Sequence, residues 1–574
     1  MPALAARIRP GDPNWPSAAE WQALAAQLRG RLLQPANRFA ACAAAADAAC
    51  AALLDDTTNP YAVGDDVSLT QAFGWADAWR CEPSRYAVAA RDAQDVAAAV
   101  RFARAHRLRL VLRGGGHAYQ GGSCAPDSLL VWTRAMNAVR LRDDFVPAGA
   151  PAGTPPSQAA TIGAGAVWAD AYHAVTTQAG RYVQGGGCMS VGVAGLVLSG
   201  GFGSFSKGFG TASANLLEAQ VVTADGAARV VNDYQEPDLF WALRGGGGGC
   251  FAAVTAVTLR THALPEHFGA VSLTIAARTD AAFQRLVALF VDHYAERLNN
   301  PHWGEQIRLT LQRELHVAML FQGLSSGQAK AAWEPFLQRV GADDELSVGF
   351  NPVPVVALSA RTFWSPALWK RWFGLMKVDT RAGAPSYHAW WSGDGAQVGQ
   401  FLEAYGSVWL GEGSLAVAER ANLARALVDA SRQWPVALHF NKGLAGASRS
   451  VRDAVRATAI NPAVGDAFAL VITASAQHHV YPGAVGREPD LQRAHQRRER
   501  VARAIARLRE LPGAGGSYFA ESDYFEKNWQ QQFWGGNYPR LAQIKARYDP
   551  EGLFFVHHGV GSEAWSGDGF TPRT

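Results

Sequence analysis

The sequence places the stretch RGGGHAYQGGS at residues 113–123, directly after the apolar run 108–112. A second stretch, GGGCMSVGVAG, occupies residues 185–195. Backbone that carries almost no side chains lets N–H groups approach a phosphate or a flat ring closely. Each stretch also holds one nucleophilic side chain, His117 or Cys188. The two stretches therefore predict a site that binds a flat, phosphate-bearing cofactor and attaches to it twice.

Length and composition indicate a folded protein with more than one domain. The 574 residues exceed what one hydrophobic core accommodates. Hydrophobic residues make up 48% and charged residues 18%, as in folded globular proteins. The net charge of +4 is small for a chain of this length, so it neither indicates nor excludes binding to nucleic acid. Because no basic stripe alternates with aromatic residues, we expect no nucleic-acid partner.

The chain has no apolar run of 18 residues, so we expect no membrane-spanning segment and no membrane partner. Residues 1–16 lack the apolar centre of a signal peptide, so the expected location is the cytoplasm, with secretion as the alternative. Six cysteines are too few for a disulfide scaffold. On one continuous helix Cys42 and Cys50 would lie about 12 Å apart, so they can pair only if the segment between them turns.

Local patterns predict several elements. Residues 17–33 are expected to form a helix, and Asp92 is expected to cap another. Asp225-Gly226 indicates a hairpin between strands, and a further strand follows. Arginines and apolar residues at helical spacing near the C-terminus predict a helix with a solvated basic face. The predicted strands span residues 108–112, 217–223, 229–231 and 253–259, and the predicted basic helix spans about residues 497–511.

Residues 263–500 differ in character from the rest. Glycine-rich loops become sparse, and tryptophans become frequent. We expect a second domain of strands and covering helices, with most of its tryptophans in the core. These tryptophans are Trp303, Trp333, Trp364, Trp369, Trp372, Trp390, Trp391 and Trp409.

Two further motifs complete a pattern that resembles a known family. DLFWALRGGGGG occupies residues 238–249, and FWGGNYPRL at 533–541 precedes YDPEGLF at 548–554. Together with the first two stretches, in this order, they resemble the FAD-linked oxidases of the berberine bridge enzyme-like group, within the vanillyl-alcohol oxidase superfamily. The resemblance runs from about residue 80 to residue 562.

The resemblance implies an α+β fold. It consists of a two-subdomain PCMH-type FAD-binding module and a separate α+β substrate domain, an antiparallel sheet covered by helices. The expected division is an N-terminal extension at 1–80, the FAD-binding domain at 81–264, the substrate domain at 265–510 and a returning C-terminal segment at 511–574. A Rossmann unit is not expected, because no G-x-G-x-x-G opens a helix after a strand with an acidic residue about twenty positions on.

The resemblance also implies bicovalent FAD. His117 would bond the flavin 8α-methyl group through a ring nitrogen, and Cys188 would bond C6. Taken singly, His117 also suits a hydrogen-bonded loop and Cys188 a buried core position. The other residues expected to bind FAD are Arg113, Gly114, Gly115, Gly116, Ala118, Ser123, Gly187, Val191, Gly192, Gly195, Gly200, Gly201, Gly203, Val254, Asn537 and Tyr538.

The expected catalytic segment departs from the family pattern. The family places a Tyr-x-Asn-Tyr-x-Asp segment near its C-terminus, whereas residues 518–523 are YFAESD. We therefore expect Glu521, or Tyr518 activated by a neighbour, to act as the base, with Tyr119 beside them. The alternative for Glu521 is a solvated loop carboxylate.

Three residues near position 440 are expected to contact the substrate. His439 and Asn441 would share one face of a strand, and Lys442 resembles a polar position that lines the family's substrate pocket. No metal site is expected, because the pairs 478–479 and 557–558 are adjacent histidines without metal spacing.

The leading functional hypothesis is an oxidase. It would remove a hydride from an alcohol, sugar or secondary-metabolite carbon and release hydrogen peroxide, so a small-molecule substrate and O2 are its expected partners. By analogy with the family, the small side chain of Val191 leaves room for oxygen beside the flavin. The alternatives are a dehydrogenase of the same fold with another electron acceptor, and a catalytically idle flavin-binding protein.

Overall fold

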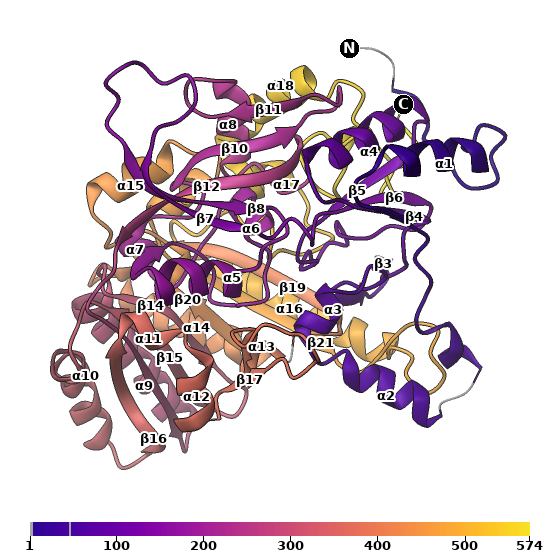
Figure 1. Ribbon diagram of the computed structural model, residues 1–574. Helices are drawn as coiled ribbons and strands as arrows, with labels where there is room; N and C mark the ends of the chain where they lie inside the picture. The colour runs from indigo at the N-terminus through magenta and orange to yellow at the C-terminus, as the bar shows by residue number, and fades with distance from the viewer. Residues whose placement is uncertain (1–3, 45–46, 373, 396, 574) are drawn as a thin grey trace.

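The computed structural model describes residues 4–44, 47–372, 374–395 and 397–573. Three main sheets organise the chain (Figure 1). The smallest has the strand order β1-β4-β6-β5, in which β4, β6 and β5 are parallel and β1 is antiparallel to β4. Its strands are β1 (Arg31–Leu33), β4 (Tyr86–Ala89), β5 (Arg109–Arg113) and β6 (Ser128–Trp132).

Helices pack on this sheet with capping as the sequence indicates. Asp92 accepts hydrogen bonds from the backbone N–H groups of Gln94 and Asp95 and so begins α4 (Ala93–Ala105), which confirms the expected cap. The helix predicted at 17–33 is too long: α1 (Ala18–Gln27) ends at Leu28, and residues 31–33 form β1 instead. Residues 31–33 pair with β4 at the edge of the sheet. The spacing of hydrophobic residues along the chain does not reveal such pairing between distant segments.

The second sheet is antiparallel and carries the loops of the site. Its order is β11-β10-β12-β8-β7, and β9 also pairs with β12. The hairpin at Asp225-Gly226 joins β10 to β11 as predicted. The strands are β7 (Val139–Phe145), β8 (Ser157–Gly163), β9 (Arg181–Val183), β10 (Leu216–Val222), β11 (Ala228–Val231) and β12 (Ala253–Ala263). The helical segments among them are α5 (Trp168–Tyr172), η2 (His173–Gln178), α6 (Val193–Leu198), α7 (Ser206–Phe209) and α8 (Pro237–Leu243).

The third sheet has nine strands, and all of them except β2 and β3 come from residues 265–510, the range expected for the substrate domain. Its order is β16-β13-β15-β14-β20-β21-β19-β2-β3. All of its pairs are antiparallel except that of β2 with β19, so this part of the fold is the expected antiparallel sheet with a parallel addition. The strands are β2 (Ala72–Trp75), β3 (Trp79–Arg80), β13 (His267–Ala277), β14 (Trp303–Leu309), β15 (Glu314–Gln322), β16 (Leu346–Ser359), β19 (Gln400–Gly411), β20 (Val436–His439) and β21 (Ala467–Gln477).

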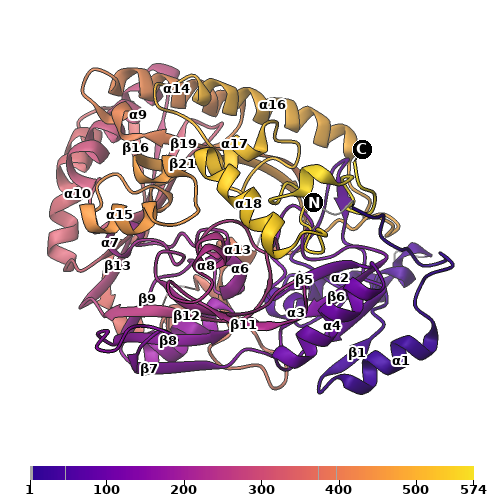
Figure 2. The same ribbon diagram turned by 90° about the horizontal axis from the view of Figure 1, so that it is seen from above.

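Long helices cover one face of the nine-stranded sheet (Figure 2). They are α9 (Asp280–His293), α10 (Ser326–Gly341), α14 (Arg420–Gln433) and α16 (Leu491–Arg509). The basic helix predicted near residue 500 is α16, and Val501 and Leu508 on its apolar side are buried. Its basic side is not wholly solvated, because Arg497 forms an ion pair with Glu403 of β19, whose side chain is fully buried.

Most of the tryptophans of this region belong to the core, as expected. Trp391 is half-buried, and the side chain of Trp372 lies outside the described residues. The buried ones are Trp303, Trp333, Trp364, Trp369, Trp390 and Trp409, none more than 5% exposed.

The remaining short elements are η1 (Ala40–Ala43), α2 (Ala48–Asp56), α3 (Pro60–Gly64), η3 (Tyr294–Leu298), α11 (Ala360–Phe363), α12 (Pro366–Trp372), β17 (Met376–Val378), β18 (Ala389–Trp391), α13 (Ser392–Gly395), η4 (Glu412–Leu415), η5 (Phe440–Lys442), α15 (Arg449–Arg456), η6 (Pro462–Gly465) and η8 (Ser562–Ala564).

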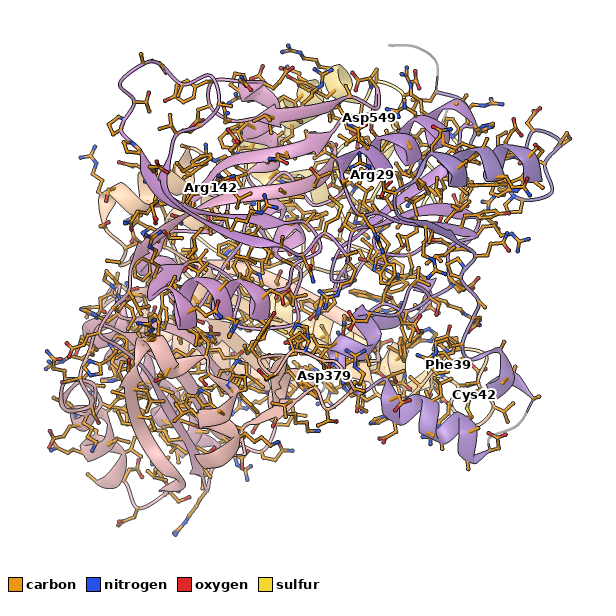
Figure 3. All side chains as sticks on the ribbon, viewed as in Figure 1. Arg29, Phe39, Cys42, Arg142, Asp379 and Asp549 are labelled. Carbon is orange, nitrogen blue, oxygen red and sulfur yellow. A yellow bond between two sulfur atoms is a disulfide. The ribbon has the colours of Figure 1, made fainter. Side chains whose placement is uncertain are left out.

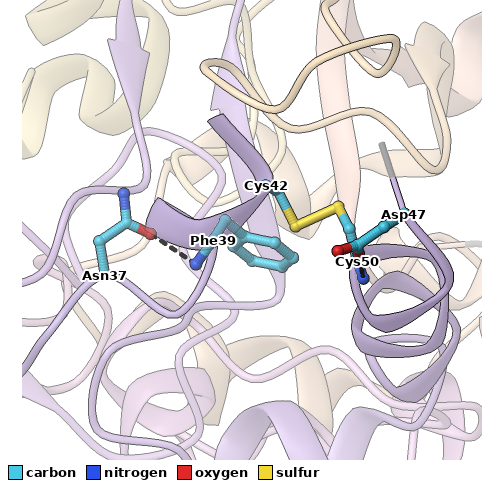
Figure 4. Close-up of a disulfide and its surroundings, with 5 residues drawn as sticks. All are labelled: Asn37, Phe39, Cys42, Asp47 and Cys50. Carbon is cyan, nitrogen blue, oxygen red and sulfur yellow. Dashed lines mark hydrogen bonds between the residues drawn. A yellow bond between two sulfur atoms is a disulfide. The ribbon is translucent and has the colours of Figure 1, made fainter. Parts of the chain in front are cut away.

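A disulfide joins Cys42 and Cys50 in the N-terminal region (Figure 4). The two residues belong to separate short helices, η1 and α2, and their Cα atoms are 5.4 Å apart. Asp47 caps the second helix by accepting a hydrogen bond from the N–H of Cys50. The two cysteines therefore do not lie on one continuous helix, and their Cα atoms are close enough for the disulfide that the sequence analysis left open.

The C-terminal segment returns to the smallest sheet. After α17 (Trp529–Trp534), η7 (Gly535–Asn537) and α18 (Tyr538–Tyr548), Phe554 forms a parallel bridge to Leu110 of β5. The buried ammonium of Lys545 lies 2.6 Å from the carboxylate of Asp549, labelled in Figure 3. Asp549 also accepts hydrogen bonds from the backbone N–H groups of Leu553 and Phe554. The ion pair and these hydrogen bonds together hold the returning segment against the sheet.

No helix within the described ranges combines the length and apolar character that crossing a bilayer requires.

Candidate active site

The two glycine-rich stretches meet backbone to backbone. One follows β5, and the other connects β9 to α6. A Cβ atom added to Gly115 would lie 2.6 Å from the backbone nitrogen of Gly192. One added to Gly192 would lie 2.8 Å from the nitrogen of Gly115. Side chains are therefore excluded at this crossing, and the glycines let the two loops form one surface.

His117 and Cys188 converge on one serine. The Oγ atom of Ser190 lies 3.3 Å from Nε2 of His117 and 3.6 Å from Sγ of Cys188. Burial lowers the pKa of His117 to about 4, so the imidazole is neutral at neutral pH. Burial also raises the pKa of Cys188, so its sulfur is a protonated thiol in the absence of another group. The site thus presents a neutral imidazole and a thiol to the same small volume.

The residues at this surface fit a flavin cofactor. His117, Gly187 and Cys188 are partly accessible although buried residues surround them, and Gly195 in the first turn of α6 is exposed. A Cβ atom added to Gly195 would meet nothing within 4 Å. The first turn of a helix offers N–H groups without intrahelical acceptors, which suits a pyrophosphate. We conclude that His117, Cys188 and the start of α6 would hold the FAD, which when bound accepts a hydride from carbon.

Other residues expected at the cofactor contact protein groups. The Arg113 guanidinium donates to the backbone oxygens of Leu69 and Val67, and so fixes the segment before β2. A Cβ atom on Gly203 would lie 1.9 Å from the backbone oxygen of Gly185, a close approach that only glycine permits. Gly201, Ser123 and Val254 are buried, whereas Gly114 and Ala118 are half-buried beside the His117 loop.

The motif near residue 537 has a packing role in the structure. Asn537 donates a hydrogen bond from Nδ2 to the backbone oxygen of Ile460 at 2.8 Å. The Tyr538 hydroxyl donates to Glu563 at 2.6 Å, and Trp534 donates to the backbone oxygen of Gly245. The Trp534 contact attaches the C-terminal segment to the five-glycine stretch at residues 245–249, and none of the three contacts involves His117 or Cys188.

Glu521 and Lys442 form an ion pair. Glu521 is therefore not the solvated loop carboxylate that the sequence left open, and its side chain is 23% exposed. The Lys442 ammonium also lies 5.8 Å from the centre of the Tyr518 ring. The strand expected to carry His439 and Asn441 ends at His439, and Asn441 and Lys442 lie in the 3₁₀ turn η5. The expected shared strand face is wrong, because the helical turn redirects the chain after His439.

Two tyrosines adjoin this ion pair. Tyr119 donates a hydrogen bond to Oε1 of Gln397 at 3.1 Å, and its ring centre lies 5.6 Å from that of Tyr405. Burial, and next the charge of Glu521, raise the pKa of both Tyr518 and Tyr119. Both phenols therefore stay protonated at neutral pH and can donate hydrogen bonds, which favours Glu521 over Tyr518 as a proton acceptor.

The sequence analysis missed Glu305. This residue of β14 has a φ of +63°, and its carboxylate accepts a hydrogen bond from Ser204. A Cβ atom on Gly187, next to Cys188, would lie 3.4 Å from its Oε1 atom. A second missed carboxylate is Asp394 of α13, which lies near the Cys188 thiol, and burial raises its pKa to about 6. For Glu305, the available signal was an acidic residue in an alternating series whose other members are the apolar residues Trp303, Ile307 and Leu309.

Replacing Glu305 with glutamine is expected to stabilise the protein at high pH only. Burial raises the pKa of Glu305, so its protonated form fits the folded state better. The stability that this preference contributes is present below the ordinary carboxyl pKa and is lost as the pH rises through the raised value. Glu305→Gln should therefore raise the Tm at pH 8 and leave it nearly unchanged at pH 4. An equal shift at both pH values would contradict this reasoning.

The family models that match the chain agree with this geometry. Residues 84–232 match the model described as FAD binding domain, and residues 517–561 match the one described as Berberine and berberine like. The first contains both glycine-rich stretches, and the second contains Glu521. These matches define the class of the protein as a flavoprotein oxidoreductase.

Curated relatives match over the whole length. The FAD-linked oxidoreductase easE of Arthroderma otae is 31% identical over 592 residues, covering 98% of this chain and 90% of the relative. The FAD-linked oxidoreductase malF of Malbranchea aurantiaca is 29% identical, covering 99% of this chain and 94% of the relative. The chain therefore belongs to the FAD-linked oxidoreductases of the berberine bridge enzyme-like group, within the vanillyl-alcohol oxidase superfamily.

Solved structures share the fold. The VAO-type flavoprotein MtVAO615 from Myceliophthora thermophila C1 has a TM-score of 0.78 at 22% identity, covering 98% of both chains. A glucooligosaccharide oxidase from Acremonium strictum has a TM-score of 0.61 at 22% identity, covering 83% of this chain and 91% of that one. That oxidase is described as carrying 6-S-cysteinyl, 8α-N1-histidyl FAD.

Proposed function

We propose that this protein is an oxidase with bicovalent FAD. It removes a hydride from an alcohol, sugar or secondary-metabolite carbon, and O2 takes up the electrons to give H2O2. The observation that carries the proposal is the convergence of His117 and Cys188 on Ser190, at 3.3 and 3.6 Å. The linkage described for the glucooligosaccharide oxidase uses the same two residue types and supports this assignment.

The protein's own groups supply the proton chemistry in this proposal. Glu521 accepts the proton of the substrate hydroxyl, and the Lys442 ammonium beside it balances the negative charge. Tyr518 and Tyr119 remain protonated and orient the substrate by donating hydrogen bonds. Trp409 is buried and donates to the backbone oxygen of Lys442 at 2.8 Å, which holds the lysine turn in place.

The oxygen step rests on the small side chain of Val191. Its backbone nitrogen donates to the oxygen of Cys188 at 3.3 Å, so it lies beside one linking residue. The side chain is half-buried and packs at the edge of the main core cluster. A small side chain at this position, next to the proposed cofactor site, leaves room for O2. This supports an oxidase over a dehydrogenase.

Turnover experiments test the proposed reaction. The purified holoenzyme is mixed without oxygen with a panel of alcohols, sugars and amines, and the visible flavin absorbance is followed. We expect at least one alcohol or sugar to bleach it, and readmitted oxygen to restore it with one H2O2 formed per O2 consumed. Bleaching that air does not reverse, but an artificial electron acceptor does, would identify a dehydrogenase. No bleaching by any compound would favour the idle flavin-binding alternative.

A further inference from the structure

Four of the six cysteines lie in one buried cluster outside the active site. Cys42 and Cys50 form the disulfide, and Cys81 and Cys124 are free thiols, 2% and 7% exposed. Cys81 and Cys124 pack in the same cluster of buried side chains, close enough for each thiol to change the pKa of the other. The proposed oxidase reaction uses neither thiol, so this contact needs an explanation of its own.

The surroundings of Cys81 favour a thiolate. Its Sγ atom lies 3.2 Å from the hydroxyl oxygen of Thr70, whose hydrogen is shared with the backbone oxygen of Ala72 at 2.8 Å. The hydrogen bond from Cys124, followed by that from Thr70 and the charge of Arg113, lowers the pKa of Cys81 below the usual range of a thiol. The pKa of Cys124 is raised, chiefly by its bond to Cys81. The pair therefore consists of one nucleophilic sulfur and one protonated thiol in contact with it.

A cavity gives access to Cys81. It has a volume of about 370 Å³, and Cys81 is part of its lining. Arg80, Glu82 and Arg85, which also line it, are exposed, so the cavity is reached from solvent. Pro126 and Asp127, which follow Cys124 by two and three positions along the chain, also line the cavity. The volume is many times that of a small oxidant such as hydrogen peroxide.

We propose that Cys81 and Cys124 form a peroxide-reactive dithiol that closes to a second disulfide. The Cys81 sulfur attacks one oxygen of H2O2, the O–O bond breaks, and with one proton the products are a sulfenic acid and water. The Cys124 sulfur then attacks the Cys81 sulfur, and the S–O bond breaks to release a second water molecule. In total two thiols are oxidised by two electrons, and one H2O2 is reduced to two waters.

The new bond would connect two segments that position His117. Cys81 follows β3, and Cys124 lies seven residues after His117 on its loop. The indole of Trp79 in β3 already donates a hydrogen bond to the backbone oxygen of Tyr119 at 3.0 Å. A Cβ atom on Gly121 would lie 2.7 Å from the same indole ring. The dithiol thus lies where oxidation turns an existing packing contact into a covalent one.

Peptide mapping after peroxide treatment tests this proposal. The holoenzyme is exposed to added H2O2, so the result does not depend on its own oxidase activity. Free thiols are then alkylated under denaturing, non-reducing conditions, and the digest is analysed by mass spectrometry. We expect a peptide pair cross-linked through Cys81 and Cys124, two hydrogens lighter than the sum of its parts. Cys250 is the internal control: it is 1% exposed, burial raises its pKa to about 11, and it should remain alkylated.

Single variants assign the two roles. In Cys124→Ser, Cys81 should accumulate a sulfenic acid that dimedone traps, whereas in Cys81→Ser the remaining Cys124 should stay a free thiol. The proposal is overturned if, in the wild type, Cys81 and Cys124 stay alkylated as fully as Cys250 after peroxide treatment. The wild-type digest decides this even if a variant does not fold.

Discussion

Replacing both His117 and Cys188 with alanine is expected to release all of the flavin on denaturation. The wild type should keep its yellow colour after unfolding and precipitation. His117→Ala and Cys188→Ala should each keep it as well, because one bond remains in each variant. Only the double variant loses both nucleophiles that converge on Ser190. The measurement is flavin fluorescence in a denaturing gel together with the visible spectrum of the denatured protein.

A matched variant controls for the loss of a cysteine as such. Cys250 is buried and its thiol donates a hydrogen bond to the backbone oxygen of Gly248, so Cys250→Ala should retain the full colour. If the colour washes out of the wild type on denaturation, the flavin is not covalently bound, and the proposed roles of His117 and Cys188 have to be withdrawn. The membership of the family would stand, because it rests on the sequence match.

Glu521→Gln is expected to lower kcat about 10²–10⁴-fold, the usual contribution of a positioned general base. Glutamine keeps the shape of the side chain but cannot take a proton, and it leaves the Lys442 ammonium without its counter-charge. The loss should appear mainly in kcat, since the base acts in the transition state. Stopped-flow measurement of flavin bleaching with the substrate found in the turnover panel gives the rate directly.

Glu526→Gln is the matched control for this prediction. Glu526 lies five residues further along the same segment and forms an ion pair with Arg509 at 2.7 Å, away from Lys442. The same chemical change there should leave the bleaching rate within about twofold of the wild type. A Glu521→Gln enzyme that bleaches as fast as the Glu526→Gln enzyme would exclude Glu521 as the base.

The sequence was informative where chemistry needs particular residue types in a row. The bare backbone around His117 and Cys188 predicted one cofactor site built from two loops, and the structure brings these loops together where Gly115 and Gly192 cross. Capping by Asp92 and the hairpin at Asp225-Gly226 were also correct, because turns and caps depend on neighbouring residues.

The sequence failed where distant segments compete for the same residues. Residues 31–33 continue a helical pattern, yet they form β1 because the edge of the sheet accepts them at Val88. Likewise, a strand-like alternation runs through residue 441, but the chain turns into η5 after His439. Neither result follows from local propensity, because the free energy that decides it comes from pairing and packing with the rest of the fold.

By itself, then, the sequence identified the family, and it predicted the cofactor loops and the two linking residues, since these depend on short runs of residues with fixed chemistry. Only the tertiary structure decided the surroundings of the reacting groups. It paired Glu521 with Lys442 across 79 positions and brought Glu305 to the residue before Cys188. It also placed Cys81 and Cys124 in one buried cluster. Such contacts join strands and loops that are far apart along the chain, and burial there sets the pKa values on which the chemistry depends.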